Sequence, residues 1–286
     1  MNSLTTKAYA KINLYLDVCD LRPDGYHNIE SLMQQVSLCD TVTVSRLDEG
    51  CGISIACTDP AVPTDGKNIV HKCAVRFFEH FGIENYSISI HIEKNIPSCG
   101  GLAGGSTDGA AVLKLLNQLY GTNANEGTLC EIGVKVGADI PFCIMGGTCV
   151  CRGIGEILTP VEIEQPKYQV LISFPGEGIS TPTAYKMLDE LEKPAVHAGI
   201  DQVIASLQNG EIPTKMYNVF ELAVLPNHEN ARLVKKTMLE TGAVSAMMSG
   251  SGSTIFGLFA DEETMNSAAC ALHKLGFGSH SCTPNN

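Results

Sequence analysis

The sequence predicts a two-domain α+β fold, with strands and helices mixed in both halves of the chain. Two patterns predict this class: some segments alternate apolar and polar residues, and others repeat apolar residues at helical spacing. No series of parallel strand–helix–strand units appears. The length of 286 residues allows one large or two medium domains. The pattern of predicted strands and helices changes near residues 155–165, so we predict domains over residues 1–158 and 159–286.

The charge and the apolar runs narrow the class of protein. Nineteen basic and thirty-one acidic residues give a net charge of −12, which argues against nucleic acid as a partner. A small anion held by backbone N–H groups remains compatible with this charge. No apolar run reaches the length of a membrane span, and the N-terminus lacks a signal-peptide cleavage site. We therefore expect a cytoplasmic protein without a membrane partner, and no obligate protein partner is evident.

Twelve cysteines raise the question of a metal site or a disulfide framework. The chain contains no Cys-x-x-Cys, and Cys149 and Cys151 would face the same side of a strand. We expect reduced thiols that pack as small apolar side chains.

The first half of the chain begins with two predicted strands, over residues 7–19 and 29–46. Pro23, Asp24 and Gly25 supply a turn between them. Apolar periodicity then predicts a helix over 69–82 that stops at Gly82, and alternation predicts a strand over 86–97. Further helices are expected after a glycine-rich loop and over 126–136, and a strand pair within 148–161.

The second half has a different order of elements. A short buried strand is predicted over 168–175, and a helix over 181–191 with Thr181 and Pro182 as cap and first turn. Residues 218–242 are helical with a break at Pro226. Residues 243–261 alternate as strand, glycine turn and strand, and a last helix follows over 263–276.

The glycine-rich loop carries the strongest functional signal. In PSCGGLAGGSTDGAAVLKLLNQLYG, residues 97–121, four glycines fall within residues 100–105 and precede an amphipathic helix. Either Ser106 or Thr107 is a natural N-cap for that helix. A strand, a glycine loop and a helix N-terminus together favour a phosphate-binding cradle. A tight turn without a ligand is the alternative. The P-loop pattern is not met because the loop has no lysine, and the dinucleotide-binding pattern G-x-G-x-x-G is not met by the spacing of the glycines.

PSCGGLAGGSTDGAA resembles the second motif of the GHMP kinases, named for galactokinase, homoserine kinase, mevalonate kinase and phosphomevalonate kinase. AKINLYLDVCDLRPDGYHNIESLMQQVSLCDTV, GADIPFCIMGGTCVCRGIGEILTPV and MMSGSGSTIFGLF resemble, in order, motifs of those members that phosphorylate a cytidyl diphosphate sugar alcohol. The resemblance runs from residue 8 to about residue 260. It implies the two-domain GHMP kinase fold with the active site in the inter-domain cleft. It also implies ATP and Mg²⁺ as cofactors and transfer of phosphate to a 2-hydroxyl in the non-mevalonate isoprenoid precursor pathway.

The resemblance also implies roles for two charged residues, Lys11 and Asp139. Asp139 precedes Pro141 at a stiff junction, and from the residues alone it is equally well a cap of the next turn. A lone strand lysine such as Lys11 is usually solvated. The resemblance implies instead that Asp139 is the catalytic base, that Lys11 pairs with it, and that Asn13 contacts the substrate.

The remaining site residues follow from the same resemblance. The cradle for ATP comprises Pro97, Ser98, Cys99, Gly100, Gly101, Leu102, Ala103, Gly104, Gly105, Ser106 and Thr107, with Asn68 and Lys94 near adenine. Tyr26 and Tyr185 would stack on cytosine, His27 would bond its polar edge, and Thr181 would belong to the same substrate site. For Tyr185, a core position at helical spacing with Leu188 is the alternative. The metal ligands stay open, with Ser106 a better candidate than Glu131.

Two rival functions share parts of this site. Another GHMP kinase acting on mevalonate, homoserine or a sugar would keep the cradle and Asp139 but has no use for Tyr26 and Tyr185. A catalytically silent nucleotide-binding module would not need both Lys11 and Asp139. Turnover that depends on the cytidine moiety would exclude the kinase for another acceptor. Nucleotide binding without turnover would favour the silent module.

Overall fold

The computed structural model describes residues 2–48, 52–98, 100–164, 166–176, 178–191 and 199–285. The chain forms two compact units, each built from separated segments. Unit 1 comprises Met1–Ala10, Cys39–Ser98 and Ala103–Met145, and unit 2 comprises Lys11–Leu38, Cys99–Leu102 and Gly146–Asn286. Two long strands, β1 (Ser3–Leu21) and β2 (His27–Arg46), contribute residues to both units.

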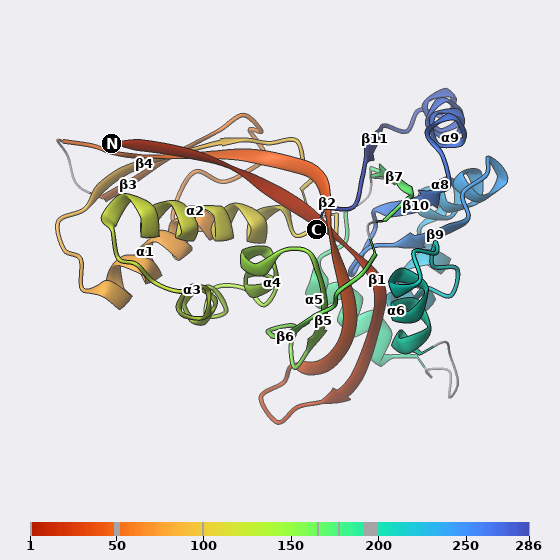
Figure 1. The fold of residues 1–286 in the computed structure, drawn as a ribbon, viewed down its shortest axis with the longest axis horizontal. Coiled ribbons are helices and arrows are strands. Elements are labelled where there is room, and N and C mark those ends of the chain that lie inside the picture. Colours follow the sequence, from red (N-terminus) through yellow and green to blue (C-terminus); the bar gives the residue numbers. More distant parts are fainter. Residues whose placement is uncertain are drawn as a thin grey trace. The chain divides into compact units, whose positions relative to one another are not determined.

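In unit 1, helices pack against one side of its part of a seven-stranded sheet (Figure 1). Its strands are β3 (Gly52–Cys57) and β4 (Ser87–Glu93), which pair in parallel, and the second half of β2, which pairs antiparallel with β4 from Thr41↔Glu93 to Arg46↔Ile88. The helices are α1 (Ile69–Phe81), α2 (Gly104–Tyr120), α3 (Glu126–Gly133) and α4 (Ile140–Met145). Alternating strand residues and the apolar stripes of α1 and α2 fill the core between them, among them Val42, Val44, Phe77, Ile88, Ile90, Val112, Leu115 and Leu116.

Unit 2 contains a four-stranded antiparallel sheet in the order β11-β7-β10-β9. Its strands are β7 (Gln169–Ser173), β9 (Ser245–Met248), β10 (Ile255–Phe259) and β11 (Ser279–Cys282). Away from this sheet, β5 (Thr148–Arg152) pairs with β2 and with β6 (Ile157–Pro160), and β8 (Tyr217–Asn218) runs parallel to β1. The helices of unit 2 are α5 (Thr181–Asp189), α6 (Ile200–Gln208), α7 (Phe220–Val224), the 3₁₀ helix η1 (Leu225–Asn227), α8 (Glu229–Glu240) and α9 (Glu262–Lys274).

Strands and helices occur together in both units, which confirms the predicted α+β class. Most predicted elements are present near their expected bounds, and Pro226 falls in η1, where the helix breaks. The prediction missed β3, α4, α6, β8 and β11, which are all short. The helix predicted over 126–136 ends at Gly133. The sequence-domain boundary at 158–159 and an active site in a cleft between domains stay predictions.

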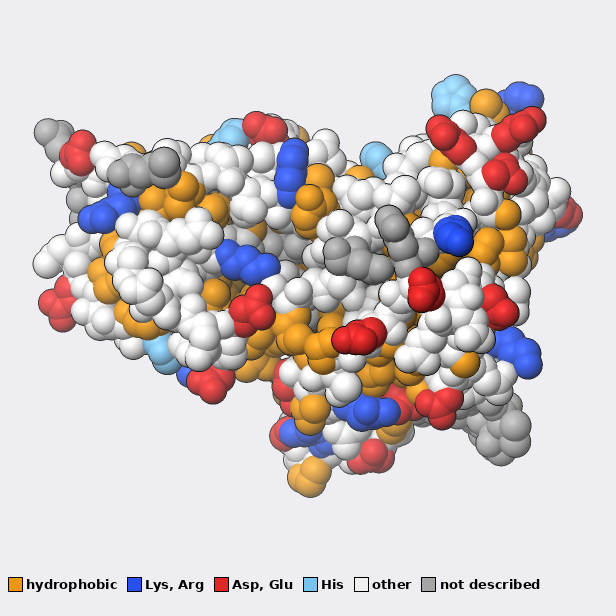
Figure 2. Space-filling model, viewed as in Figure 1, with side chains coloured by type: hydrophobic (Ala, Val, Ile, Leu, Met, Phe, Trp, Pro, Cys, Tyr) orange, Lys and Arg blue, Asp and Glu red, His pale blue; other side chains and the backbone are white. Residues whose placement is uncertain are grey.

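The surface charges and the cysteines can be described for the residues in these ranges. On the face drawn in Figure 2, the acidic and basic side chains of the described residues are interspersed rather than gathered by sign. The cysteines within the described ranges form no disulfide, and Cys73, Cys143, Cys149, Cys151 and Cys282 are buried. Within the same ranges, no helix is both long enough and apolar enough to cross a membrane.

Candidate active site

The glycine loop, defined as Pro97–Thr107, leads from the residues after β4 into α2. The helix begins at Gly104, with Ala103 as N-cap at a φ of 58°, so the predicted caps Ser106 and Thr107 are wrong. The first intrahelical bond runs from the N–H of Thr107 to the carbonyl of Ala103, at 2.9 Å. The N–H groups of Gly104, Gly105 and Ser106 therefore have no acceptor within the helix, and this end of α2 can bind an anion.

Close packing explains why α2 begins at two glycines. A Cβ added at Gly104 would lie 3.2 Å from Cγ2 of Ile96, and one at Gly105 would lie 3.0 Å from Cδ1 of Ile69. A side chain at either position would be in tight contact with these neighbours, and glycine avoids that contact at the start of the helix. Of the rest of the loop, Pro97 is half-buried, Ser98 is exposed, Gly100 and Leu102 are buried, and Cys99 lies outside the described residues.

Lys11 lies on β1 with its side chain turned into unit 2. It is 3% exposed, so it is not the solvated strand lysine that its sequence context alone would favour. Its Nζ donates to Oδ1 of Asn13 at 2.7 Å and to the carbonyl of Gly101 at 2.9 Å. An ammonium group has three N–H donors, so one donor remains beyond these two bonds. Its predicted pairing with Asp139 stays a prediction.

The carbonyl of Gly101 accepts a second hydrogen bond from the loop that joins β9 and β10. The donor is Oγ of Ser249, at 3.0 Å. Asn218 fixes that loop by donating from Nδ2 to the carbonyls of Met248 at 2.7 Å and Gly250 at 2.9 Å. Glu221 accepts the N–H of Met248 at 2.9 Å. Sequence reasoning assigned no role to Asn218 or Glu221, because their partners lie about thirty residues further along the chain.

Asp139 lies immediately before α4 in unit 1, and its carbonyl accepts the N–H of Cys143 at 3.1 Å. The residue is half-buried. It is near the glycine loop within this unit, because a Cβ on Gly137 would lie 3.8 Å from Oγ of Ser106. The structure therefore brings the start of α2 and the segment that carries Asp139 together. A general base for phosphoryl transfer has to lie near the phosphate cradle, and the role of Asp139 as that base stays a prediction.

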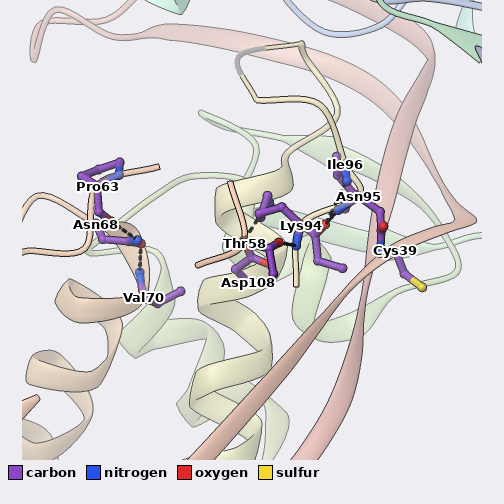
Figure 3. A network of polar contacts seen from close by, with 10 residues as sticks. Cys39, Thr58, Pro63, Asn68, Val70, Lys94, Asn95, Ile96 and Asp108 are labelled. Atoms are coloured by element: carbon purple, nitrogen blue, oxygen red, sulfur yellow. Dashed lines mark hydrogen bonds and ion pairs between the residues drawn. The ribbon is translucent and has the colours of Figure 1, made fainter. Parts of the chain in front are cut away.

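Lys94 and Asn68, predicted to lie near adenine, both have protein partners in unit 1 (Figure 3). Asn68 is the N-cap of α1: its Oδ1 accepts the N–H of Val70 at 3.0 Å and its Nδ2 donates to the carbonyl of Pro63 at 2.6 Å. Nζ of Lys94 lies 2.5 Å from Oδ2 of Asp40 and 2.9 Å from Oδ2 of Asp108. Each residue has a clear role in the fold, so contact with adenine stays a prediction.

Two residues of the predicted substrate site, His27 and Tyr185, are in contact in unit 2. The rings of His27 and Tyr185 are stacked, and Nε2 of His27 lies 3.0 Å from Oδ1 of Asp189. Tyr26 is 60% exposed, in the turn where its N–H donates to Asp24. Thr181 is the first residue of α5 rather than its cap, because Ser180 caps that helix through the N–H of Thr183. Sequence reasoning missed Asp189, although it follows Tyr185 by one helical turn.

The residues offered as metal ligands are placed differently. Ser106 is half-buried in the first turn of α2, whereas Glu131 is exposed on α3. Among the described residues, no group of three His, Cys, Asp or Glu side chains could hold a metal ion. The hydroxyl of Ser106 is an oxygen ligand of the kind that Mg²⁺ accepts beside water and phosphate oxygens.

Comparison with known proteins agrees with this geometry. The GHMP kinases N terminal domain matches residues 68–147, and the GHMP kinases C terminal domain matches residues 202–277. The 4-diphosphocytidyl-2-C-methyl-D-erythritol kinase of Clostridium perfringens (strain SM101 / Type A) is 43% identical over 265 residues, which are 92% of this chain and 91% of the relative.

Solved structures show the same likeness. A crystal structure of 4-(cytidine 5'-diphospho)-2C-methyl-D-erythritol kinase is 29% identical, with a TM-score of 0.83, and the match covers 99% of this chain and 100% of that one. Homoserine kinase from Cytophaga hutchinsonii shares the fold with a TM-score of 0.72 and 22% identity, over 99% of this chain and 95% of that one. Identity above 40% along almost the whole chain is found with the cytidyl kinase. The chain therefore belongs to the 4-diphosphocytidyl-2-C-methyl-D-erythritol kinase family of the GHMP kinases.

Proposed function

We propose that the protein transfers the γ-phosphoryl group of ATP to the 2-hydroxyl of 4-diphosphocytidyl-2-C-methyl-D-erythritol, giving the 2-phosphate and ADP. The observation that carries this proposal is the 43% identity to a named kinase of this substrate along 92% of the chain. The reaction belongs to the non-mevalonate route to isoprenoid precursors, and we place it in the cytoplasm.

The chain supplies the groups that such a transfer needs. The start of α2 offers the N–H groups of Gly104, Gly105 and Ser106 to the phosphates of ATP, where the positive end of the helix dipole adds to their effect. Asp139 accepts the proton of the attacking hydroxyl, and the remaining donor of Lys11 orients this carboxylate. Mg²⁺, when bound with ATP, neutralises charge on the phosphates that develops during transfer.

Substrate choice rests on the group around His27 in unit 2. Tyr185 and Tyr26 offer aromatic faces to the cytosine ring, and His27 offers a ring nitrogen to its polar edge, with Asn13 and Thr181 toward the remainder of the substrate. Mevalonate, homoserine and simple sugars contain no nucleobase that could stack on these rings. The 22% identity to homoserine kinase shows the fold alone and does not favour that rival.

Steady-state turnover tests this proposal. ADP release from Mg-ATP is measured with the cytidyl substrate, with mevalonate, with homoserine and with no acceptor. We expect release that requires the cytidyl compound and falls about 10²- to 10⁴-fold in Asp139→Asn, the range for loss of a general base. Glu131→Gln, a carboxylate exposed on α3, is the matched control and should retain activity. Turnover with another acceptor would replace the substrate, and tight ATP binding without any turnover would favour a silent module.

A further inference from the structure

Unit 1 buries a group of three charged side chains that the proposed reaction does not use. Nζ of Lys94 bridges Oδ2 of Asp40 at 2.5 Å and Oδ2 of Asp108 at 2.9 Å (Figure 3). The three side chains are 5%, 0% and 4% exposed, in the order Lys94, Asp40, Asp108. We call them the Asp–Lys–Asp cluster. Two carboxylates and one ammonium in the protein interior are costly to desolvate, so their retention calls for a role beyond stability.

The cluster joins the chain segments at the two ends of the glycine loop. On the entering side, Oδ1 of Asp40 accepts the N–H groups of Asn95 at 2.6 Å and Ile96 at 2.9 Å, directly before Pro97. On the leaving side, Asp108 lies in the second turn of α2, four residues after Gly104. Lys94 connects the two carboxylates and thereby ties the entering segment to the helix.

Direct packing brings the same two ends together. A Cβ on Gly104 would lie 3.2 Å from Nζ of Lys94 and 3.2 Å from Cγ2 of Ile96. The first residue of α2 thus rests against the last residues before the loop. Lys94 therefore lies close to the helix end whose N–H groups would face the phosphates.

The geometry leaves Lys94 little opportunity to contact a ligand itself. Two of its three ammonium donors are used by Asp40 and Asp108, and its side chain is 5% exposed. Oδ1 of Asp108 is also buried, and it has no hydrogen-bond partner among the described residues. Burial raises the pKa of Asp108 to about 7, while Lys94 opposes this rise.

We propose that the Asp–Lys–Asp cluster is a positioning device for the nucleotide phosphates. It holds both ends of the glycine loop, and so fixes the direction of the N–H groups of Gly104, Gly105 and Ser106. Lys94 acts through the loop and not through the adenine ring. This inference rests on the proposed function, because it assumes that the loop binds the phosphates of ATP.

The positioning role is tested by comparing the affinities of ligands that share adenosine and differ in the number of phosphates. Binding of ATP and ADP, and competition by adenosine, are measured for the wild type and for Lys94→Met, which keeps the length of the side chain and removes its charge. We expect affinity for ATP and ADP to fall about tenfold or more, because each 1.4 kcal/mol lost at an anion site is a factor of ten. The inhibition constant of adenosine should change less than about twofold. A matched control is Lys72→Met, at an exposed position of α1.

Two outcomes would overturn the positioning role of Lys94. If ATP, ADP and adenosine all weaken by the same factor, Lys94 contacts the base and the positioning role is wrong. If the folded variant binds all three as the wild type does, the cluster has no part in binding. If the wild type itself does not bind ATP, the proposed function fails first, so the two failures are distinguishable.

A second variant protects the test from loss of folding. Removing one member of a buried charge group destabilises a protein strongly, and Lys94→Met removes such a member. Asp108→Asn keeps the shape of the side chain and removes only its charge. We expect it to fold and to raise the Michaelis constant of ATP severalfold, with that of the cytidyl substrate and kcat unchanged. Equal changes in both Michaelis constants would overturn the proposal.

Discussion

The imidazole of His27 is stacked on the ring of Tyr185, with ring centroids 5.1 Å apart and planes inclined by 23°. Asp189, which contacts Nε2 of the same histidine, lies four residues after Tyr185 on α5, so one face of a single helix holds His27 from two directions. Tyr185 in turn contacts Phe220 edge-on, at 4.9 Å between centroids. The proposed cytidine site is thus anchored to the core of unit 2.

Replacement of Tyr185 should separate substrate binding from ATP binding. Tyr185→Leu removes the aromatic face while it keeps an apolar contact with Phe220, and we expect the Michaelis constant of the cytidyl substrate to rise about tenfold, corresponding to about 1.4 kcal/mol. The Michaelis constant of ATP should stay the same. Tyr185→Phe, which keeps the ring, is the control. Equal kinetics for the Leu and Phe variants would exclude a stacking role.

Gly101 should not tolerate a side chain. Its φ is +76°, and an added Cβ would overlap the carbonyl oxygen of Ser249. Gly82, at a φ of +60°, has no atom within 4 Å of an added Cβ and is the matched control. Both alanine substitutions carry a backbone cost of about 1–2 kcal/mol. In Gly101→Ala we expect an additional loss of ATP affinity of about tenfold or more, measured by nucleotide titration. Normal ATP affinity in a folded Gly101→Ala would show that the loop does not need this backbone position.

Asn218 should be sensitive to the change from amide to carboxylate. Its Nδ2 donates to two carbonyls and its Oδ1 accepts the N–H of Phe220 at 3.0 Å, all in a residue that is 3% exposed. Asn218→Asp turns an acceptor toward the carbonyls of Met248 and Gly250, so we expect the free energy of unfolding to fall by about 3 kcal/mol or more. Urea unfolding measures this. The same substitution at the exposed Asn266 of α9 should change it by less than about 0.5 kcal/mol.

The pH dependence of stability should report on Asp108. Its pKa in the folded protein is about 7, mainly because of burial, against 3.8 for the ordinary group. Between these values the unfolded chain loses the proton and the native state keeps it. The contribution of Asp108 to the free energy of unfolding therefore falls as pH rises from about 4 to 7, by up to about 1.4 kcal/mol per pH unit, and is constant above 7.

Comparison of variants isolates this contribution from other titrating groups. The stability of Asp108→Asn relative to the wild type should increase from pH 4 to 7, as measured by urea unfolding at each pH. Asp261 gives a control of opposite sign, because hydrogen bonds from Thr264 lower its pKa. The stability of Asp261→Asn relative to the wild type should therefore decrease as pH rises through the acid range. A pH-independent difference for Asp108→Asn would contradict the assigned protonation.

The sequence predicted the elements whose signals are local, and it failed where distant residues decide. Apolar periodicity and the stop at Gly82 defined α1 correctly, because both signals are local to the helix, whereas the capping role of Asn68 was not predicted. The start of α2 was misplaced because the helix begins at two glycines, which pack closely against Ile96 and Ile69 outside the helix, and not at the better capping residues Ser106 and Thr107. Short elements such as α4 and β8 give too few residues for a period to be recognised.

The same distinction applies to the candidate site. Loop composition and family resemblance pointed to the glycine loop, Lys11 and Asp139. The burial of Lys11 depends on the carbonyl of Gly101, ninety residues away, and no local pattern announces it. The carboxylate partners of Lys94 lie 54 and 14 residues away in sequence, so its part in a charge cluster could be seen only in the fold.

The interleaving of the two units limits how genes of this family can be recombined. The chain passes between the units after Ala10, Leu38, Ser98, Leu102 and Met145. A crossover at residue 158 would give a chimaera whose unit 2 takes Lys11–Leu38 from one parent and most of Gly146–Asn286 from the other. Functional chimaeras should instead require exchange of Lys11–Leu38 together with the C-terminal half, so that residues which pack in one unit descend from one parent.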